Sequence, residues 1–345
     1  KKGQKVVAEI KDCVDSRRMA EGAIITVLGY PDEKDVDIYS VVYEFGLPVD
    51  FPEEVSKEMS NVPDKVPPDL KKNRKDLRNI FTLTIDPEDA RDFDDALSLE
   101  KRGGGIYRLG VHIADVSSYV KTGTAVDREA FERGMSVYMP GRTIPMLPEK
   151  LSAGLCSLKP REERLAFSVI MDISGDGTVT DYEIAESVIR SDLRLSYQQS
   201  QDIIDGGKNT VLPASLNKNQ KEEIYSKLHG LRELSRKLLQ KWRAQGYIDF
   251  FTDEPDIKLD ENGNVLNLGV KKRLEAHKIV EACMLLANKT VAGHIGNLNK
   301  KKQKHHKFLY RVHAKPDQEK LDELMRLARA LGPGGGGGRR AARVV

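Results

Sequence analysis

An acidic run between residues 86 and 95 has the residue types and spacing best suited to chemistry in this sequence. Six of its ten positions carry a carboxylate, and Arg91 is the only base among them. The six are Asp86, Glu88, Asp89, Asp92, Asp94 and Asp95. Like charges at this density are costly unless cations neutralise them. The run therefore predicts a cation site, although a solvated surface is the commoner explanation for a charged segment.

Two features favour the cation site over the solvated surface. The run lies between the apolar stretches "FTLTI" and "ALSL", which should anchor it on a sheet. It is also dominated by Asp, whose short side chain positions an oxygen tightly. Mg²⁺ is a hard cation that takes carboxylate oxygens, and Mn²⁺ accepts the same ligands. Two such ions about 4 Å apart can activate a water and stabilise the leaving oxygen of a phosphate ester.

A calcium loop is the main alternative for such a run. The EF-hand pattern requires Gly at the sixth position and Glu at the twelfth. Counted from Asp86, these positions hold Arg91 and Leu97. The sequence therefore favours a pair of Mg²⁺ ions, with Mn²⁺ as the alternative.

The composition of the chain indicates the class of protein that carries this acidic run. The chain has 345 residues, 39% hydrophobic and 32% charged, with a net charge of +3, which predicts a soluble globular protein with a substantial core. Its three cysteines, Cys13, Cys156 and Cys283, lie far apart and form no CxxC pair, which suggests a reducing, cytoplasmic location. No segment approaches 18 consecutive apolar residues, so no contact with a membrane is expected.

Strands and helices must position the acidic run. "NIFTLTI" (79–85) alternates as a strand, with Leu83 and Ile85 on one face and Thr84 on the other. Further strands are predicted at 105–116, 164–174 and 179–197, with a turn at 175–178, and long helices at 219–245 and 270–298. Near the N-terminus, 4–10, 21–29 and 37–46 read as strands of a small barrel.

Five ordered motifs resemble the ribonuclease II/ribonuclease R family. The first is the pattern Asp-Pro-x-x-Ala-x-Asp-x-Asp-Asp-Ala from Asp86 to Ala96. The others are "GVHIADVSSYV" (110–120), "GMSVYMPGRTIPMLPEKLSAGLCSLKP" (134–160), "EAHKIVEACMLLAN" (275–288) and "FLYRVHAKPDQEKLDEL" (308–324). The linker "VYEFGLPVDFPEEV" (42–55) resembles the ribonuclease R branch most.

The resemblance implies an α+β fold, in which an RNB catalytic domain with a mixed sheet and flanking helices follows part of an OB-fold barrel of the cold-shock type. We expect the partial barrel at 1–45, a linker with one helical turn at 46–78 and the catalytic domain at 79–332. The Gly-rich segment 333–345 reads as a low-complexity tail without native structure. The family's arginine motif and C-terminal S1 domain have no counterpart here, so we expect a truncated chain.

The activity implied is that of a processive 3′→5′ exoribonuclease. It would act as a monomer on the 3′ end of single-stranded RNA, use Mg²⁺ and release nucleoside 5′-monophosphates. Asp86, Asp92, Asp94 and Asp95 match the metal-binding aspartates of the family, and Asp94 and Asp95 are the expected catalytic residues. Glu88 and Asp89 fall outside the pattern and read as bystanders.

Five further residues match positions that hold RNA in the family. Tyr138 would pack on the 3′-terminal nucleotide, and Arg142 could touch a phosphate, although a solvated arginine is equally compatible. Phe250 would close the other side of the base stack, unless Phe251 takes its place. Tyr197 and Glu281 match positions linked to sensing ribose.

Some assignments have an alternative that the sequence does not exclude. His277 reads as a packing or capping residue rather than a ligand, and the lysine-rich segment 300–307 as a solvated loop or an RNA contact. A catalytically inactive RNA-binding protein on the same scaffold is the main alternative function, although all four aspartates are present. An endonuclease is disfavoured by a terminal clamp such as Tyr138.

Overall fold

The structure is a computed structural model that describes residues 1–11, 21–206, 212, 216–249, 253–261, 263–302, 306–312 and 314–330. The chain divides into two compact units, Lys1–Val291 and Ala292–Val345. Phe250, Phe251, Cys13, part of 300–307 and the whole tail 333–345 lie outside the described residues, so the predictions made for them stay predictions.

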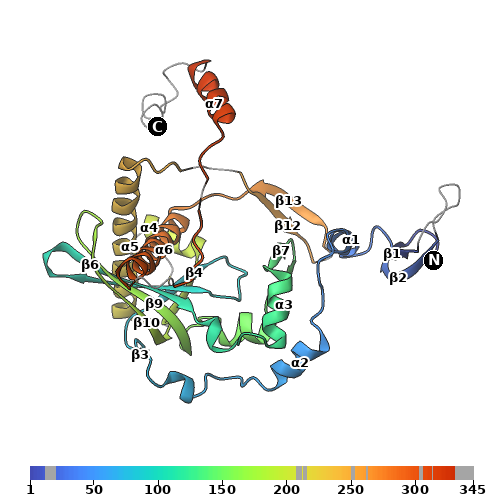
Figure 1. Cartoon of the computed structure of the whole chain (residues 1–345), viewed down its shortest axis with the longest axis horizontal. Coiled ribbons are helices and arrows are strands. Elements are labelled where there is room, and N and C mark those ends of the chain that lie inside the picture. The colour runs from blue at the N-terminus through green and yellow to red at the C-terminus, as the bar shows by residue number, and fades with distance from the viewer. Residues whose placement is uncertain are drawn as a thin grey trace. The chain divides into compact units, whose positions relative to one another are not determined.

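A seven-stranded mixed sheet forms the centre of the first unit (Figure 1). Its strands follow the order β11-β4-β5-β6-β9-β10-β3. Its strands are β3 (Lys75–Asp76), β4 (Leu83–Asp86), β5 (Asp95–Arg102), β6 (Ile106–Ala114), β9 (Glu163–Ile173), β10 (Val179–Arg190) and β11 (Leu193–Ser196). The inner pairs from β4 to β10 are antiparallel, whereas β11 lies parallel to β4, and β3 parallel to β10. The predicted mixed sheet is confirmed.

Alternation along the strands supplies a hydrophobic core on each face of this sheet. On one face, Leu83, Ile85 and Leu109 join side chains of α4 (Tyr197–Gly206), α5 (Lys218–Ala244) and α6 (Glu275–Lys302). On the other, Val55 of α2 (Glu53–Ser60) and Val126 of α3 (Ala125–Arg133) pack in a second cluster. Short helical turns complete the connections: η1 (Asp69–Lys71), η2 (Gly103–Gly105), η3 (Val116–Ser118) and η4 (Lys150–Leu155).

The strand predicted at 37–46 is wrong, because these residues form the helix α1 (Val36–Glu44). The β-branched and aromatic residues of this segment favour a strand locally. In the helix, Val36 and Val42 are buried, and the acidic Asp37 lies in the first turn, where the helix dipole favours a negative charge. The supposed linker 46–78 also holds more structure than expected, since Val55, Met59 and Val66 are buried in the second core.

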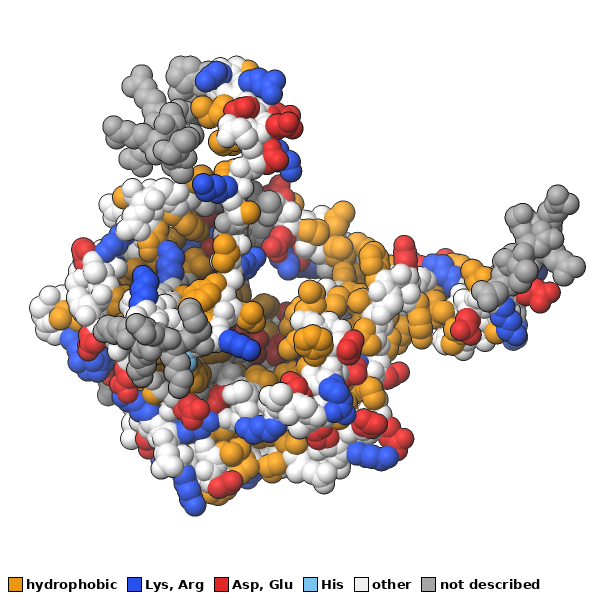
Figure 2. Space-filling view, viewed as in Figure 1, with side chains coloured by type: hydrophobic (Ala, Val, Ile, Leu, Met, Phe, Trp, Pro, Cys, Tyr) orange, Lys and Arg blue, Asp and Glu red, His pale blue; other side chains and the backbone are white. Residues whose placement is uncertain are grey.

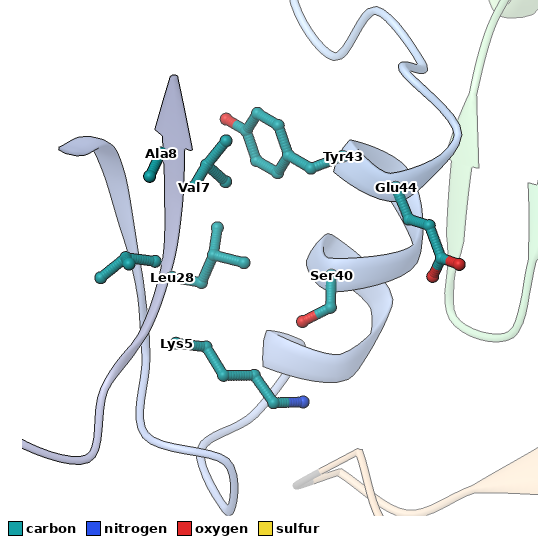
Figure 3. Close-up of a pocket in the computed structure, with 8 residues that line it drawn as sticks. Lys5, Val7, Ala8, Leu28, Ser40, Tyr43 and Glu44 are labelled. Carbon is teal, nitrogen blue, oxygen red and sulfur yellow. The ribbon is translucent and has the colours of Figure 1, made fainter. Parts of the chain in front are cut away.

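Three two-stranded pairs of the described residues lie outside the main sheet, and one of them is β7 (Val137–Met139) with β8 (Arg142–Ile144). β1 (Lys5–Ile10) pairs with β2 (Gly22–Gly29), and β12 (Pro255–Leu259) pairs with β13 (Val265–Val270). Apolar side chains stay exposed on the β12–β13 pair, including Leu266 and Leu268, and orange side chains cover this area in Figure 2. A pocket of about 470 Å³ lies between β1–β2 and α1, and no predicted site residue lines it. Figure 3 shows the side chains around this pocket.

The second unit contains the end of α6 and the helix α7 (Gln318–Ala330). Among the described helices, none combines the length and the apolar character that crossing a membrane requires.

A buried polar chain links four strands of the sheet. His112 of β6 is 1% exposed, with Nε2 2.9 Å from Ser98 Oγ and Nδ1 2.7 Å from Ser168 Oγ. Ser168 Oγ lies 2.7 Å from Ser187 Oγ on β10. Burial lowers the pKa of His112 to about 4, so the imidazole is neutral at physiological pH.

We expect this histidine to make the fold sensitive to acid. Between pH 6.5 and 4 the unfolded chain binds a proton at His112 that the folded chain does not, so the free energy of unfolding falls as the pH drops through this range. Protonation of His112 in the unfolded chain lowers the free energy of unfolding by at most about 3 kcal/mol. Urea unfolding of the wild type and of His112→Gln at several pH values measures it. The difference in stability between the two proteins should shrink towards pH 4, and a constant difference would contradict the prediction.

Candidate active site

The acidic run joins two neighbouring antiparallel strands. Asp86 is the last residue of β4, and Asp95 is the first residue of β5. Leu83 pairs with Leu97, a register that brings Asp86 and Asp94 towards each other where the strands separate. Ser196 of β11 pairs with Asp86 from the other side, so Tyr197 follows directly beside the cluster. The sheet therefore gathers residues that lie more than 100 positions apart in the sequence.

The four aspartates influence one another electrostatically. Burial first, and then the charges of Asp94 and Asp92, raise the pKa of Asp86 to about 6, although the Thr84 side chain and the charge of Arg194 oppose the shift. Burial, Asp86 and Asp94 raise the pKa of Asp95 to about 7. Partial desolvation and then Asp92 raise the pKa of Asp94 as well. The structure thus brings the four predicted residues together. Glu88 and Asp89 are exposed, as Asp94 is.

Backbone hydrogen bonds hold the loop between the two strands. Ser157 Oγ donates to the Arg91 carbonyl at 2.8 Å and accepts from the Phe93 N–H at 3.1 Å. The Leu158 N–H donates to the Phe93 carbonyl, and the Ala114 N–H to the Asp94 carbonyl, both at 2.9 Å. The Phe93 ring is itself buried in the second core. The "GLCSLKP" motif is therefore a support for the acidic loop.

Arg194 supports the same loop from β11, and no pattern in the sequence pointed to this role. Its Nη2 donates to the Pro87 carbonyl and to the Glu88 carbonyl, the latter at 2.8 Å. Its positive charge acts on Asp86. An arginine in a short strand is an ordinary residue, and only the parallel pairing of β11 with β4 brings it here.

The donor chemistry of the cluster fits a hard divalent cation. All four side chains are carboxylates, and Asp86 Oδ2 is buried with no hydrogen-bond partner among the described residues. A cation would satisfy this oxygen and offset the crowded negative charge. The described His, Cys, Asp and Glu side chains nevertheless form no ready-made group of three that could hold a metal ion. Asp86, Asp92, Asp94 and Asp95 would hold it after their carboxylates turn towards a common point.

Tyr138 reaches this cluster, whereas Arg142 does not contact it. Tyr138 lies on β7 (Val137–Met139), is 65% exposed, and donates from its hydroxyl to Asp92 Oδ2 at 2.7 Å. Arg142 lies on β8 (Arg142–Ile144) and donates to the Tyr39 hydroxyl of α1. Its guanidinium also lies 4.5 Å from the centre of the Tyr39 ring. In this structure Arg142 is engaged by α1 rather than left as a free cation beside the aspartates.

Tyr197 lies near the aspartates and stacks on a histidine. Its ring centre is 3.9 Å from that of His277, with the planes 14° apart. Burial and then the charges of Asp95 and Asp86 raise the pKa of Tyr197 to about 12. His277 Nδ1 accepts the Leu274 N–H at 3.1 Å, just before α6 begins. His277 therefore packs and caps, as the sequence indicated.

Glu281 belongs to a network of ion pairs at the start of α6. Its Oε2 accepts Arg273 Nη2 at 2.5 Å, and its Oε1 accepts the Tyr247 hydroxyl at 3.3 Å. Arg273 Nη1 donates to Asp249 at 2.5 Å. The Glu281 carboxylate is thus oriented by partners that the sequence did not identify.

Comparison with known proteins identifies the family. The model of the RNB domain matches residues 74–337. The chain belongs to the RNB domain family. The cold shock domain model matches residues 1–52 of this RNB protein, so the resemblance and the predicted fold class are both confirmed.

Ribonuclease R of Aquifex aeolicus (strain VF5) is 41% identical over 332 residues, which cover 96% of this RNB chain and 45% of that protein. Mycoplasma genitalium RNase R, solved in complex with double-stranded RNA, superposes with a TM-score of 0.85 at 26% identity over 96% of this chain and 56% of that one. Yeast Ssd1, a pseudonuclease, shares the fold with a TM-score of 0.69 at 20% identity, over 96% of this chain and 39% of that one. The chain spans about half the length of the relatives it matches.

Proposed function

We propose that this chain carries the cleavage site of a processive, metal-dependent 3′→5′ exoribonuclease that acts on single-stranded RNA. The observation that carries the proposal is the cluster of Asp86, Asp92, Asp94 and Asp95 with a buried Asp86 oxygen that has no partner among the described residues. Its relatives named as ribonuclease R support the same function.

The residues of the site have separate tasks in this proposal. A divalent cation, when bound, supplies charge neutralisation on the phosphate and lowers the pKa of a water. The aspartates hold that charge where β4 ends and β5 begins, and the accessible Asp94 faces the scissile phosphate. The Tyr138 ring stacks on the 3′-terminal base without regard to its identity. Tyr197 and Glu281 offer polar atoms to the ribose 2′-hydroxyl.

The experiment is a cleavage assay on single-stranded RNA labelled at its 5′ end, with the 345-residue chain, in Mg²⁺, in Mn²⁺ and in EDTA. The expected result is a ladder that shortens from the 3′ end and vanishes in EDTA. Cuts at internal positions would support an endonuclease instead. RNA binding without cleavage in either metal would contradict the proposal for this chain.

A catalytically inactive RNA-binding protein is the second candidate. The fold shared with a pseudonuclease means that the RNB architecture alone does not guarantee cleavage. The complete aspartate set favours the enzyme, since an inactive relative has no need to keep four costly charges together.

Tyr138→Ala is expected to change the length of the final undegraded oligonucleotide more than the rate of cleavage. The side chain is 65% exposed, so its removal costs little stability, but one face of the terminal base would lose its stacking partner. Tyr138→Phe is the matched control, because it removes only the hydrogen bond to Asp92. End-product analysis on a sequencing gel measures the length. An unchanged product from the alanine variant would exclude the clamp.

A further inference from the structure

A second charged feature lies apart from the aspartates, in a cavity of about 470 Å³ between α5 and the start of α6. Its charged lining consists of Arg236, Arg243, Arg273, Lys278 and Glu275. Four cations therefore face one carboxylate. None of the four aspartates lines this cavity, so its chemistry has to be explained separately.

Two of these cations are engaged by carboxylates at close range. Arg236 Nε donates to Glu275 at 2.5 Å. Arg273 donates to Asp249 and to Glu281, each at 2.5 Å. These ion pairs hold the arginine side chains that line the cavity. Arg273 lines the cavity and also bonds to Glu281.

The other two cations donate no side-chain hydrogen bond to any residue that the structure describes. Arg243 and Lys278 each lie 3.7 Å from Asp249, with no hydrogen bond to it, and Asp249 already accepts Arg273. Their side chains are 55% and 34% exposed. Including Arg232, which also pairs with Glu275, the network holds five cations against three carboxylates. This excess of positive charge favours the binding of an anion.

We propose that this cavity binds a phosphate group of the RNA backbone, with Arg243 and Lys278 as its ligands. Arginine and lysine with free N–H donors are the usual partners of phosphate oxygens. Arg273 joins the cavity to Glu281, so the phosphate belongs to a nucleotide near the ribose that Glu281 contacts in the proposed function. The inference rests on that function for the identity of the polyanion. The phosphate contact contributes to RNA affinity and not to cleavage, because none of the four aspartates lines the cavity.

The test is the salt dependence of RNA binding, measured by fluorescence anisotropy in EDTA, where no metal-dependent cleavage occurs. The double variant Arg243→Gln/Lys278→Gln should bind single-stranded RNA about 3- to 10-fold more weakly at 0.1 M salt, with a salt slope smaller by about 0.7 for each lost phosphate contact. The single variant Arg243→Glu should weaken RNA binding more than this double variant does. The matched control is Arg128→Gln/Lys57→Gln, which removes the same two charges from exposed surface pairs and should leave the slope unchanged.

Equal slopes and affinities for the cavity variant and the wild type would overturn the proposal, and so would a loss of binding of the same size in the control. Polyglutamate provides the test for an acidic protein segment as the occupant. If the cavity variant lost polyglutamate binding but kept RNA binding, the proposal would be wrong. The Mg²⁺ cleavage ladder is scored separately, so a failure of the proposed enzyme activity is distinguishable from a failure of this site.

Discussion

Replacing Asp94 with Asn should abolish RNA cleavage while RNA affinity stays within about twofold of the wild type. The change keeps the shape of the side chain and removes one negative charge from the group that is to hold the cations. Losing several kcal/mol of charge stabilisation in the transition state corresponds to a rate lower by about 10³-fold or more. Asp94 is exposed, and its carbonyl still accepts the Ala114 N–H, so the fold should tolerate the change.

Asp89→Asn is the matched control for this experiment. Asp89 lies in the same loop, is exposed, and falls outside the family pattern. Its variant should cleave at the wild-type rate. Single-turnover cleavage and RNA affinity would be measured for both variants. Wild-type turnover by Asp94→Asn would refute the assignment of the metal site.

Arg194→Gln is expected to lower cleavage by about 10- to 100-fold, since an active-site shift near 1 Å costs about 10²-fold. The arginine donates to the Pro87 and Glu88 carbonyls, and hydrogen bonds from charged groups contribute about 1.5–3 kcal/mol each. Without them, the segment after Asp86 should lose its fixed position. Removing the positive charge beside Asp86 acts in the opposite direction, because it makes the site more attractive to cations.

Arg194→Lys separates these two effects, because lysine keeps the positive charge and most of the length of the arginine side chain. If loop geometry dominates, Mn²⁺ binding followed by electron paramagnetic resonance should weaken in the glutamine variant and recover largely in the lysine variant. Arg108→Gln is the control, because it breaks a bidentate pair with Asp172 away from the acidic loop. Tighter Mn²⁺ binding by Arg194→Gln would show that charge, and not geometry, is what Arg194 contributes.

Local patterns in the sequence predicted the parts of this fold that depend on alternation. The strand before Asp86 places Leu83 and Ile85 in one core, as expected from the period of two. The same reasoning failed at 37–46, where β-branched residues form α1 because Val36 and Val42 find burial there as a helix. Local propensity was overridden by tertiary packing.

At the site, too, the features that depend on neighbouring residues could be predicted, and those that depend on residues far apart in the sequence could not. The acidic cluster was visible because its members lie within ten residues of one another. Arg194 was not, because its role depends on a parallel pairing between strands more than 100 residues apart. Arg142 was predicted either to touch a phosphate or to be solvated, and its contact with Tyr39 could not be foreseen without the helix that carries Tyr39. The ion pairs that orient Glu281 likewise join separate elements.

The anchors of the acidic loop have a consequence for its evolution. Ser157, Leu158, Ala114 and Arg194 all hold it through main-chain atoms, which every amino acid except proline provides in full. Positions 88, 89 and 91 can therefore accumulate substitutions without moving the four aspartates that flank them. The loop combines mutational tolerance at these exposed positions with a fixed backbone path, so related chains can vary its surface charge while they keep the same arrangement of carboxylates.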